Sequence, residues 1–138
     1  MVKQIFLLFL LLVSQQVKAQ TTTDSHKIVF QLITADTTAH KAFMKQLNNI
    51  HKVSPNSDIQ VVVHGPAIQA FEQSKSVISI QVEDAIKRGV VFSICEFSLQ
   101  ERKVAKDQLL ANLFFVKAGI IHIVELQEKN YCYIKAGF

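Results

Sequence analysis

Short apolar runs alternate with amphipathic segments along this chain, and this alternation limits its fold more than any other feature. The apolar runs, such as residues 59–64 and 90–95, are rich in β-branched side chains and show no strict alternation of apolar and polar positions. Strands of this composition are buried on both faces, as in parallel sheets covered by helices. The pattern therefore predicts an α/β domain, in which a five-stranded, mostly parallel sheet carries helices on both faces.

Turn and cap signals between the runs predict the order of the elements. The expected strands are residues 27–32, 59–64, 90–95, 113–116 and 131–135. The expected helices are residues 39–52, 67–71, 82–88 and 98–110. Residues 120–130 fit both a helix and a strand by periodicity, and we expect a helix because residues 125–129 have strong helix-forming composition.

The first nineteen residues predict where the protein acts. Lys3 is followed by an apolar stretch over residues 5–13 and by a small-x-small site that ends at Ala19. This is the pattern of a secretory signal peptide, and the stretch is much shorter than the roughly 20 residues of a membrane span. We expect a signal peptide over residues 1–19, a flexible leader over 20–26 and a single domain over 27–138. The mature protein is then periplasmic or secreted, with no membrane attachment.

Charge and motifs exclude several function classes. Without residues 1–19, thirteen Lys and Arg side chains remain against eleven acidic ones, and they are scattered. A nucleic-acid surface needs a basic stripe with interleaved aromatic residues, so we expect no nucleic-acid partner. The glycine-rich nucleotide loops, the zinc-protease motif and the nucleophile elbow of serine hydrolases are also missing. His40 and His51 lie on one predicted helix about 16 Å apart along its axis, too far to share a metal. We expect both histidines at the surface, and no metal or other cofactor.

Cys95 ends the third predicted strand, at the edge of the sheet where open α/β proteins keep their binding sites. His64 ends the second strand, just before Gly65, and so lies at the same edge. Asp36 follows the first strand there. Each has a structural alternative: a free cysteine often fills a core, a histidine at a strand end satisfies backbone groups, and an aspartate before a helix caps it.

Several stretches, in this order and spacing, carry a family resemblance. They are residues 27–32 with Asp36, then 47–50, 61–65, 87–90 running on to Cys95, 117–120, and 126–129 ahead of Tyr131. From about His26 to Lys135 the chain resembles the DsrE/DsrF-like sulfur relay family, small α/β proteins that include the soluble YchN-like proteins. The resemblance implies the strand order 2-1-3-4-5, assembly into homotrimers or homohexamers, and a pocket cysteine that accepts sulfur as a persulfide.

On this chain the persulfide role falls on Cys95, with Asp36, His64, Gly65 and Glu96 as expected pocket residues. The start of a helix after the strand favours the thiolate, which is the nucleophile, whereas the neighbouring Glu96 carboxylate disfavours it. The leading hypothesis is an extracytoplasmic sulfur carrier or sulfurtransferase, whose partner is a sulfur donor or acceptor protein or a small sulfane-sulfur compound. The alternative is a non-catalytic oligomeric protein of the same fold that binds a small ligand or is structural, with Cys95 only packing.

The two cysteines of the mature chain are expected to stay unpaired. In the implied order, strand four separates Cys95 from Cys132 by about 10 Å, whereas bridged cysteines have Cα atoms within roughly 7 Å. We therefore predict two free thiols, with Cys132 buried and Cys95 at least partly accessible.

Overall fold

The computed structural model describes residues 25–137. The predicted signal peptide and all but the end of the predicted leader lie outside the described residues. Within the described part of the chain, no helix is long and apolar enough to cross a membrane.

The strands and helices follow the predicted order closely. The strands are β1 (Lys27–Leu32), β2 (Asp58–Val63), β3 (Val91–Cys95), β4 (Phe114–Val116) and β5 (Cys132–Ala136). The helices are α2 (Thr37–Val53), α3 (Ser79–Lys87), α4 (Glu96–Arg102) and α5 (Gly119–Glu128), with two 3₁₀ turns, η1 (Gly65–Phe71) and η2 (Lys106–Gln108). The segment that periodicity left open is thus a helix, and Asn130 follows it with φ of 67°, in the left-handed region expected there.

One predicted helix is too long. Residues 98–110 were expected to be helical, but α4 ends at Arg102 because Lys103 takes a left-handed conformation with φ of 55°. The N–H of Val104 then donates to the Leu99 carbonyl at 3.0 Å, which satisfies a carbonyl at the end of the helix. The chain turns back at this point.

The sheet is entirely parallel, and its order is β4-β3-β2-β1-β5. The α/β class, the five strands and the helices on both faces are confirmed. Two of the four neighbouring pairs expected from the order 2-1-3-4-5 are present, β1–β2 and β3–β4. The other two differ: β3 pairs with β2 and not with β1, and β5 pairs with β1 and not with β4.

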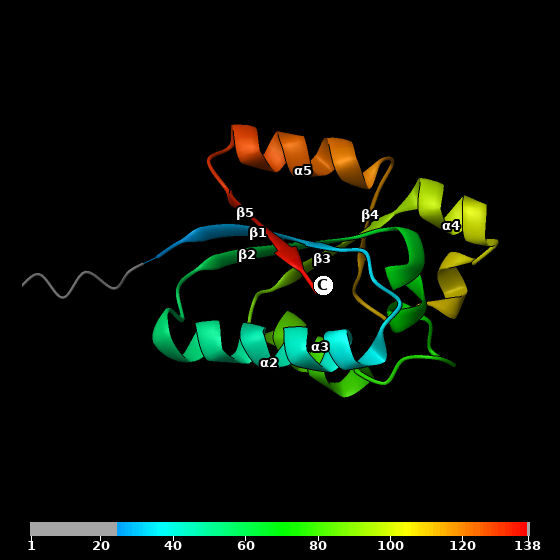
Figure 1. Cartoon of the computed structure of the whole chain (residues 1–138), viewed down its shortest axis with the longest axis horizontal. Helices are drawn as coiled ribbons and strands as arrows, with labels where there is room; N and C mark the ends of the chain where they lie inside the picture. The colour runs from blue at the N-terminus through cyan, green and yellow to red at the C-terminus, as the bar shows by residue number, and fades with distance from the viewer. Residues whose placement is uncertain (1–24, 138) are drawn as a thin grey trace, which may run out of the picture.

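The path of α5 explains this difference. The connections from β1 to β4 advance step by step in one direction, and right-handed crossovers then place α2 and α3 on the same face. The connection from β4 to β5 runs back in the opposite direction, so α5 lies on the other face, as Figure 1 shows. It brings β5 to the free edge of β1 and not to the edge beside β4.

The two faces of the sheet differ in how much they bury. The face toward α2 and α3 forms the main core, where the Phe30 and Phe43 rings meet edge to face at 5.2 Å and the Phe71 and Phe92 rings lie 5.4 Å apart. The face toward α5 has a much smaller buried cluster, which consists of Val29, Val62, Ile123 and Leu126. α5 is therefore held to the sheet by few apolar side chains.

Candidate functional site

Cys95 is the last residue of β3 and the N-cap of α4, so it lies at the carboxyl edge of the sheet as predicted. Its predicted accessibility is wrong, because only 5% of the residue is exposed. Cys132 was expected to be buried, but it is exposed, since β5 is an edge strand and not an inner one. Both cysteines are free thiols, and β2 and β1 lie between their strands.

Gly119, the first residue of α5, covers the Cys95 sulfur. Its backbone N–H donates to Cys95 Sγ at 3.2 Å. A Cβ atom at this position would lie 3.3 Å from the Cβ atoms of both Cys95 and His64, and 3.2 Å from Val62 Cγ1. Those contacts are tighter than most Cβ contacts, so a larger residue at this position would require a neighbour to shift by a few tenths of an ångström. The same contacts place Cys95 and His64 side by side beneath Gly119.

Two helices begin at this sulfur, and neither has a side-chain oxygen at its N-cap. The N-cap residues are Cys95 for α4 and Ala118 for α5, and neither side chain makes a regular capping hydrogen bond. The first N–H groups of a helix lack partners within the helix and carry its positive partial charge. At the start of α5, the Cys95 sulfur accepts the Gly119 N–H in place of a capping oxygen.

Further hydrogen bonds favour the thiolate form of Cys95. Burial is the largest influence and raises the pKa of the Cys95 thiol, but neighbouring hydrogen-bond donors, chiefly the Ser98 hydroxyl and the Gly119 N–H, outweigh it together and bring the pKa below its ordinary value. The thiol can donate its own proton to the Lys117 carbonyl, but that oxygen is 4.0 Å from Sγ. The site therefore stabilises a buried sulfur anion with neutral donors.

The Glu96 carboxylate disfavours the Cys95 thiolate less than its place next to Cys95 in the sequence suggests. Its carboxylate pairs with the Lys106 ammonium at 2.5 Å. The hydrogen bond to Lys106 and its positive charge, together with the more distant Lys117, lower the pKa of Glu96. The negative charge beside Cys95 is therefore balanced by lysine.

His64 is half-buried at the end of β2. Its ring is one end of a row of hydrogen-bonded side chains that spans three strands. Its Nε2 lies 2.8 Å from the Gln31 amide nitrogen, and the Gln31 amide oxygen accepts a hydrogen bond from the Tyr133 hydroxyl. With the amide assigned this way, His64 Nε2 is an acceptor and the ring is neutral. Burial also lowers the pKa of His64. His64 thus neighbours Cys95 without supplying a positive charge.

The other two predicted pocket residues differ in their relation to Cys95. Gly65 joins the site through its N–H, which donates to Ser98 Oγ at 2.8 Å, and its φ of 56° suits a glycine. Asp36 is exposed and caps α2, accepting the Thr38 N–H at 2.7 Å. Asp36 is therefore a helix cap, the structural alternative stated above. Its carboxylate is bound at the start of α2, which lies on the face of the sheet opposite α5.

The sequence prediction missed three residues of this cluster: Ser98, Gly119 and Gln31. Ser98 follows Cys95 by three residues, the spacing at which an N-cap side chain meets the third residue of a helix. That spacing was a usable signal. Gly119 and Gln31 reach the site only through the path of α5 and the sheet order, which local pattern does not reveal.

The described residues contain no cluster of three or more His, Cys, Asp or Glu side chains that would hold a metal. His40, expected at the surface, is 1% exposed, and its Nε2 lies 2.7 Å from the Thr34 carbonyl oxygen. It turns toward the sheet because the inner face of α2 includes its position, next to Ala39.

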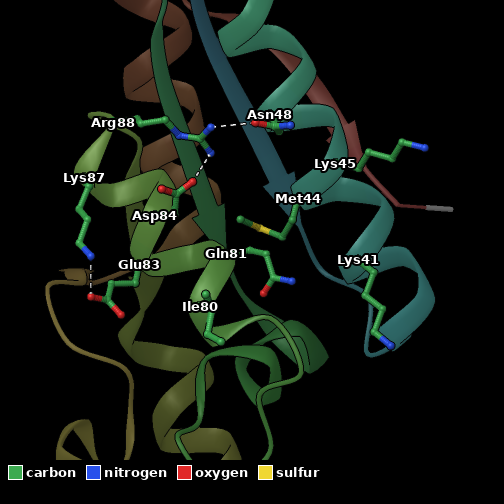
Figure 2. Close-up of a pocket in the computed structure, with 10 residues that line it drawn as sticks. All are labelled: Lys41, Met44, Lys45, Asn48, Ile80, Gln81, Glu83, Asp84, Lys87 and Arg88. Carbon is green, nitrogen blue, oxygen red and sulfur yellow. Dashed lines mark hydrogen bonds and ion pairs between the residues drawn. The ribbon is translucent and has the colours of Figure 1, made fainter.

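Two hollows of the surface lie near the helices, and Cys95 lines neither of them. Figure 2 shows a groove of about 550 Å³ between α2 and α3, where Arg88 joins Asp84 at 3.1 Å and Asn48 at 2.9 Å, and Lys87 joins Glu83 at 2.9 Å. Lys41 and Lys45 also line this groove, and neither has an ion pair among the described residues, so its lining carries more positive than negative charge. A second hollow of similar volume lies beside α4 and begins at Glu96, next to Cys95 in the chain. No cysteine lines either hollow.

Comparisons with known proteins agree with this architecture. The model of the DsrE/DsrF-like family matches residues 13–136. A solved structure of MTH1491 from Methanobacterium thermoautotrophicum, described as a protein of unknown function, is 23% identical with a TM-score of 0.76, over 80% of this chain and 99% of that one. The ychN protein from E. coli is 12% identical with a TM-score of 0.67, over 80% and 98%. None of the curated proteins compared with the chain matches it.

Proposed function

Since the chain belongs to the DsrE/DsrF-like family, a family related to sulfur relay, we propose that it carries sulfane sulfur on Cys95 outside the cytoplasm. One observation supports this role above all others: the Cys95 sulfur is buried yet accepts a hydrogen bond from the Gly119 N–H, and its donors lower its pKa. The thiolate is the nucleophilic form of cysteine. A residue that only filled the core would need no such donors.

The transfer step uses only sulfur chemistry. The Cys95 thiolate attacks the outer sulfur of a polysulfide or of a donor persulfide, and a new S–S bond forms as the donor's S–S bond breaks. The electron pair of the broken bond leaves on the donor sulfur, which departs as a thiolate or hydrosulfide. Cys95 then holds a persulfide, and an acceptor thiolate removes the outer sulfur by the same reaction. No redox cofactor is needed, because no net oxidation occurs.

Access to the sulfur requires a local shift, because Cys95 is 5% exposed. The cover is the start of α5, which is anchored on the sheet mainly by Ile123 and Leu126 against Val29 and Val62. Small buried clusters of this kind open at lower free energy than a main core. A small displacement of the α5 start exposes Sγ to a donor.

Assembly into a homotrimer or homohexamer is part of the proposal. Large apolar side chains are exposed on elements that meet near Cys95. They are Phe97 on α4, Phe114 and Phe115 on β4, and Ile120, Ile121 and Val124 on α5. Large apolar areas on a surface are typical of protein–protein contacts. A second copy of the chain covers part of this surface, and a donor or acceptor protein uses what remains.

The extracytoplasmic location rests on the pattern of residues 1–19 alone. Periplasmic or secreted relays meet donors such as polysulfide directly, so a small sulfane-sulfur compound is a suitable partner besides a protein. Fractionation of the expressing cells, with the mature N-terminus determined by mass spectrometry, tests the location. A cytoplasmic, uncleaved chain contradicts it.

Native mass spectrometry tests the carrier role. The purified protein is treated with polysulfide, and we expect a gain of about 32 Da per chain from one added sulfur. Cys95→Ser abolishes this gain, whereas Cys132→Ser, the matched control on the exposed thiol, retains it. A gain that persists in Cys95→Ser, or a wild-type protein that gains nothing, contradicts the proposal.

The low exposure of Cys95 favours a second candidate, a binding or structural protein in which this thiol only packs. Alkylation of the native protein separates the two. A carrier thiol reacts at neutral pH while the protein is folded, whereas a packing thiol reacts only after denaturation. The exposed Cys132 thiol supplies the internal reference for reagent access.

A further inference from the structure

We propose that Lys117 makes the Cys95 site selective for negatively charged sulfur donors, because its ammonium group lies at the mouth of the site and binds the incoming anion. The inference rests on the proposed carrier function. It adds a specificity-determining residue that contacts the donor itself, and it names the charge of the donors that the site accepts.

The main chain of Lys117 lies beside the Cys95 sulfur. The Lys117 carbonyl oxygen is 4.0 Å from Sγ and accepts the Phe97 N–H at 3.3 Å. Two residues later, the Gly119 N–H donates to the same sulfur at 3.2 Å. Lys117 therefore belongs to the short segment between β4 and α5 that closes over Cys95.

The Lys117 side chain reaches across to the start of α4. Its Nζ lies 5.2 Å from the centre of the Phe97 ring, a distance at which an aromatic face attracts a cation. Phe97 is the second residue of α4 and is 52% exposed, so this contact lies at the surface. Lys117 thus joins the two helix starts that meet at Cys95, once through its main chain and once through its ammonium group.

The charge of Lys117 is not balanced by a carboxylate. Among the described residues Lys117 has no ion pair, whereas Lys106 pairs with Glu96 at 2.5 Å. These three side chains together leave one positive charge at the rim of the site. The neutral His64 ring on the other side of the sulfur adds none.

The proposed reaction brings two negative charges together, and a cation at the mouth offsets their repulsion. Cys95 attacks as a thiolate, and polysulfide is an anion at neutral pH. In water, a unit charge about 4 Å away changes the local concentration of an ion by roughly fivefold, and the effect is larger beside a low-dielectric protein.

The Phe97 ring gives the donor a second contact. Sulfur atoms pack favourably against aromatic rings, and a chain of sulfur atoms is poorly hydrated between its charged ends. The ammonium group and the ring together fit an anionic sulfur chain better than a neutral disulfide. Phe97 then belongs to the part of the exposed apolar surface that remains for a donor.

Two alkylating reagents of similar size and different charge test the proposal on the full chain, with Cys132→Ser as background. Iodoacetate is an anion and iodoacetamide is neutral, and both react with the same thiolate after the same opening of the site. The ratio of their rate constants at Cys95, measured at one pH, therefore reports the charge that the reagent meets. Changes in the thiolate fraction or in the opening of α5 cancel in this ratio.

Lys117→Gln should lower the ratio of the iodoacetate rate to the iodoacetamide rate about fivefold, and Lys117→Arg should keep it near the wild-type value. Lys45→Gln removes the same charge from an exposed position of α2, on the other face of the sheet, and should leave the ratio unchanged. A tenfold increase in salt, from about 0.05 M, should lower the wild-type ratio toward that of Lys117→Gln. A ratio that Lys117→Gln does not change, or that Lys45→Gln lowers equally, overturns the proposal.

Sulfur loading separates this proposal from the carrier function. A ratio that falls in Lys117→Gln, in a protein that gains no sulfur from polysulfide, shows that the mouth selects anions and that the carrier function is wrong. Normal loading with an unchanged ratio keeps the carrier function and overturns the role of Lys117. A folded protein whose Cys95 reacts with neither reagent contradicts both. Where both hold, the initial rate of loading from polysulfide falls several-fold in Lys117→Gln.

Discussion

The two faces of the sheet have different tasks. The face toward α2 and α3 buries aromatic rings such as those of Phe43 and Phe92, and the groove between these helices contains two ion pairs. The face toward α5 has a small apolar cluster, and beside it lie polar groups that converge on the Cys95 sulfur. One face buries most of the apolar core, and the other covers the buried Cys95 thiol.

This difference shows that hollow volume is a poor guide to chemistry in a small parallel sheet. The groove in Figure 2 is roomy, and its charges are two ion pairs and the lysines Lys41 and Lys45, which have no ion pair among the described residues. Cys95 is only 5% exposed, but the first N–H of α5 donates to its sulfur at 3.2 Å. The donor directed at the sulfur identifies this site, whereas open space does not.

Removal of a large side chain from the main core should have the largest effect. Phe92 is fully buried and contacts the Phe71 ring, so Phe92→Ala should lower the free energy of unfolding by about 3–5 kcal/mol. Urea denaturation followed by circular dichroism measures this loss. A cost under about 1 kcal/mol would contradict the view that this face holds most of the stability.

Removal of an α5 anchor should cost less and act more locally. Ile123→Ala should lower the free energy of unfolding by about 2 kcal/mol, because the small cluster borders solvent and relaxes around the lost atoms. It should also raise the alkylation rate of native Cys95 several-fold, since α5 opens more often. An unchanged rate would mean that α5 does not control access to the sulfur.

The Cys95 pKa makes stability depend on pH. Its folded pKa lies below the ordinary value of 9.0, so between the two the unfolded chain binds more protons and stability rises with pH. The difference in unfolding free energy between wild type and Cys95→Ser should therefore increase up to about pH 9 and level off above it. Below the folded pKa the contribution is lost. Urea titrations at several pH values measure it, and a flat difference contradicts the thiolate.

A change in the groove should have the smallest effect. Lys45 is exposed on α2 at the groove, so Lys45→Ala should change the unfolding free energy by no more than about 0.5 kcal/mol. Sulfur loading measured by mass spectrometry should stay at the wild-type level. Loss of loading would place the working surface on the α2 side and reverse the comparison of the two faces.

The strands and most helices are predictable because each has its own apolar period and turn residues. The apolar residues of β3 identify it as a strand without reference to the rest of the chain. Strand order is different, because it depends on where α5 crosses the sheet, and residues 117–131 look the same for either edge. The exposure of Cys132 was mispredicted for that reason, since it follows from β5 being an edge strand.

The candidate site was predictable only in part. Cys95, His64 and Gly65 end or follow neighbouring strands, so the sheet edge brings them together. Asp36 also follows a strand, but its carboxylate caps α2, the local interaction that competes with any role in a pocket. The Gly119 donor lies 24 residues after Cys95, and no local pattern encodes that contact.

The lid over the sulfur is main chain, because Gly119 has no side chain to contribute. A lid of this kind has no part that a point mutation can reshape without lifting the helix that bears it. A methyl group at position 119 would press on Val62, Cys95 and His64 at once, so this single atom would displace either the sulfur's neighbours or the start of α5.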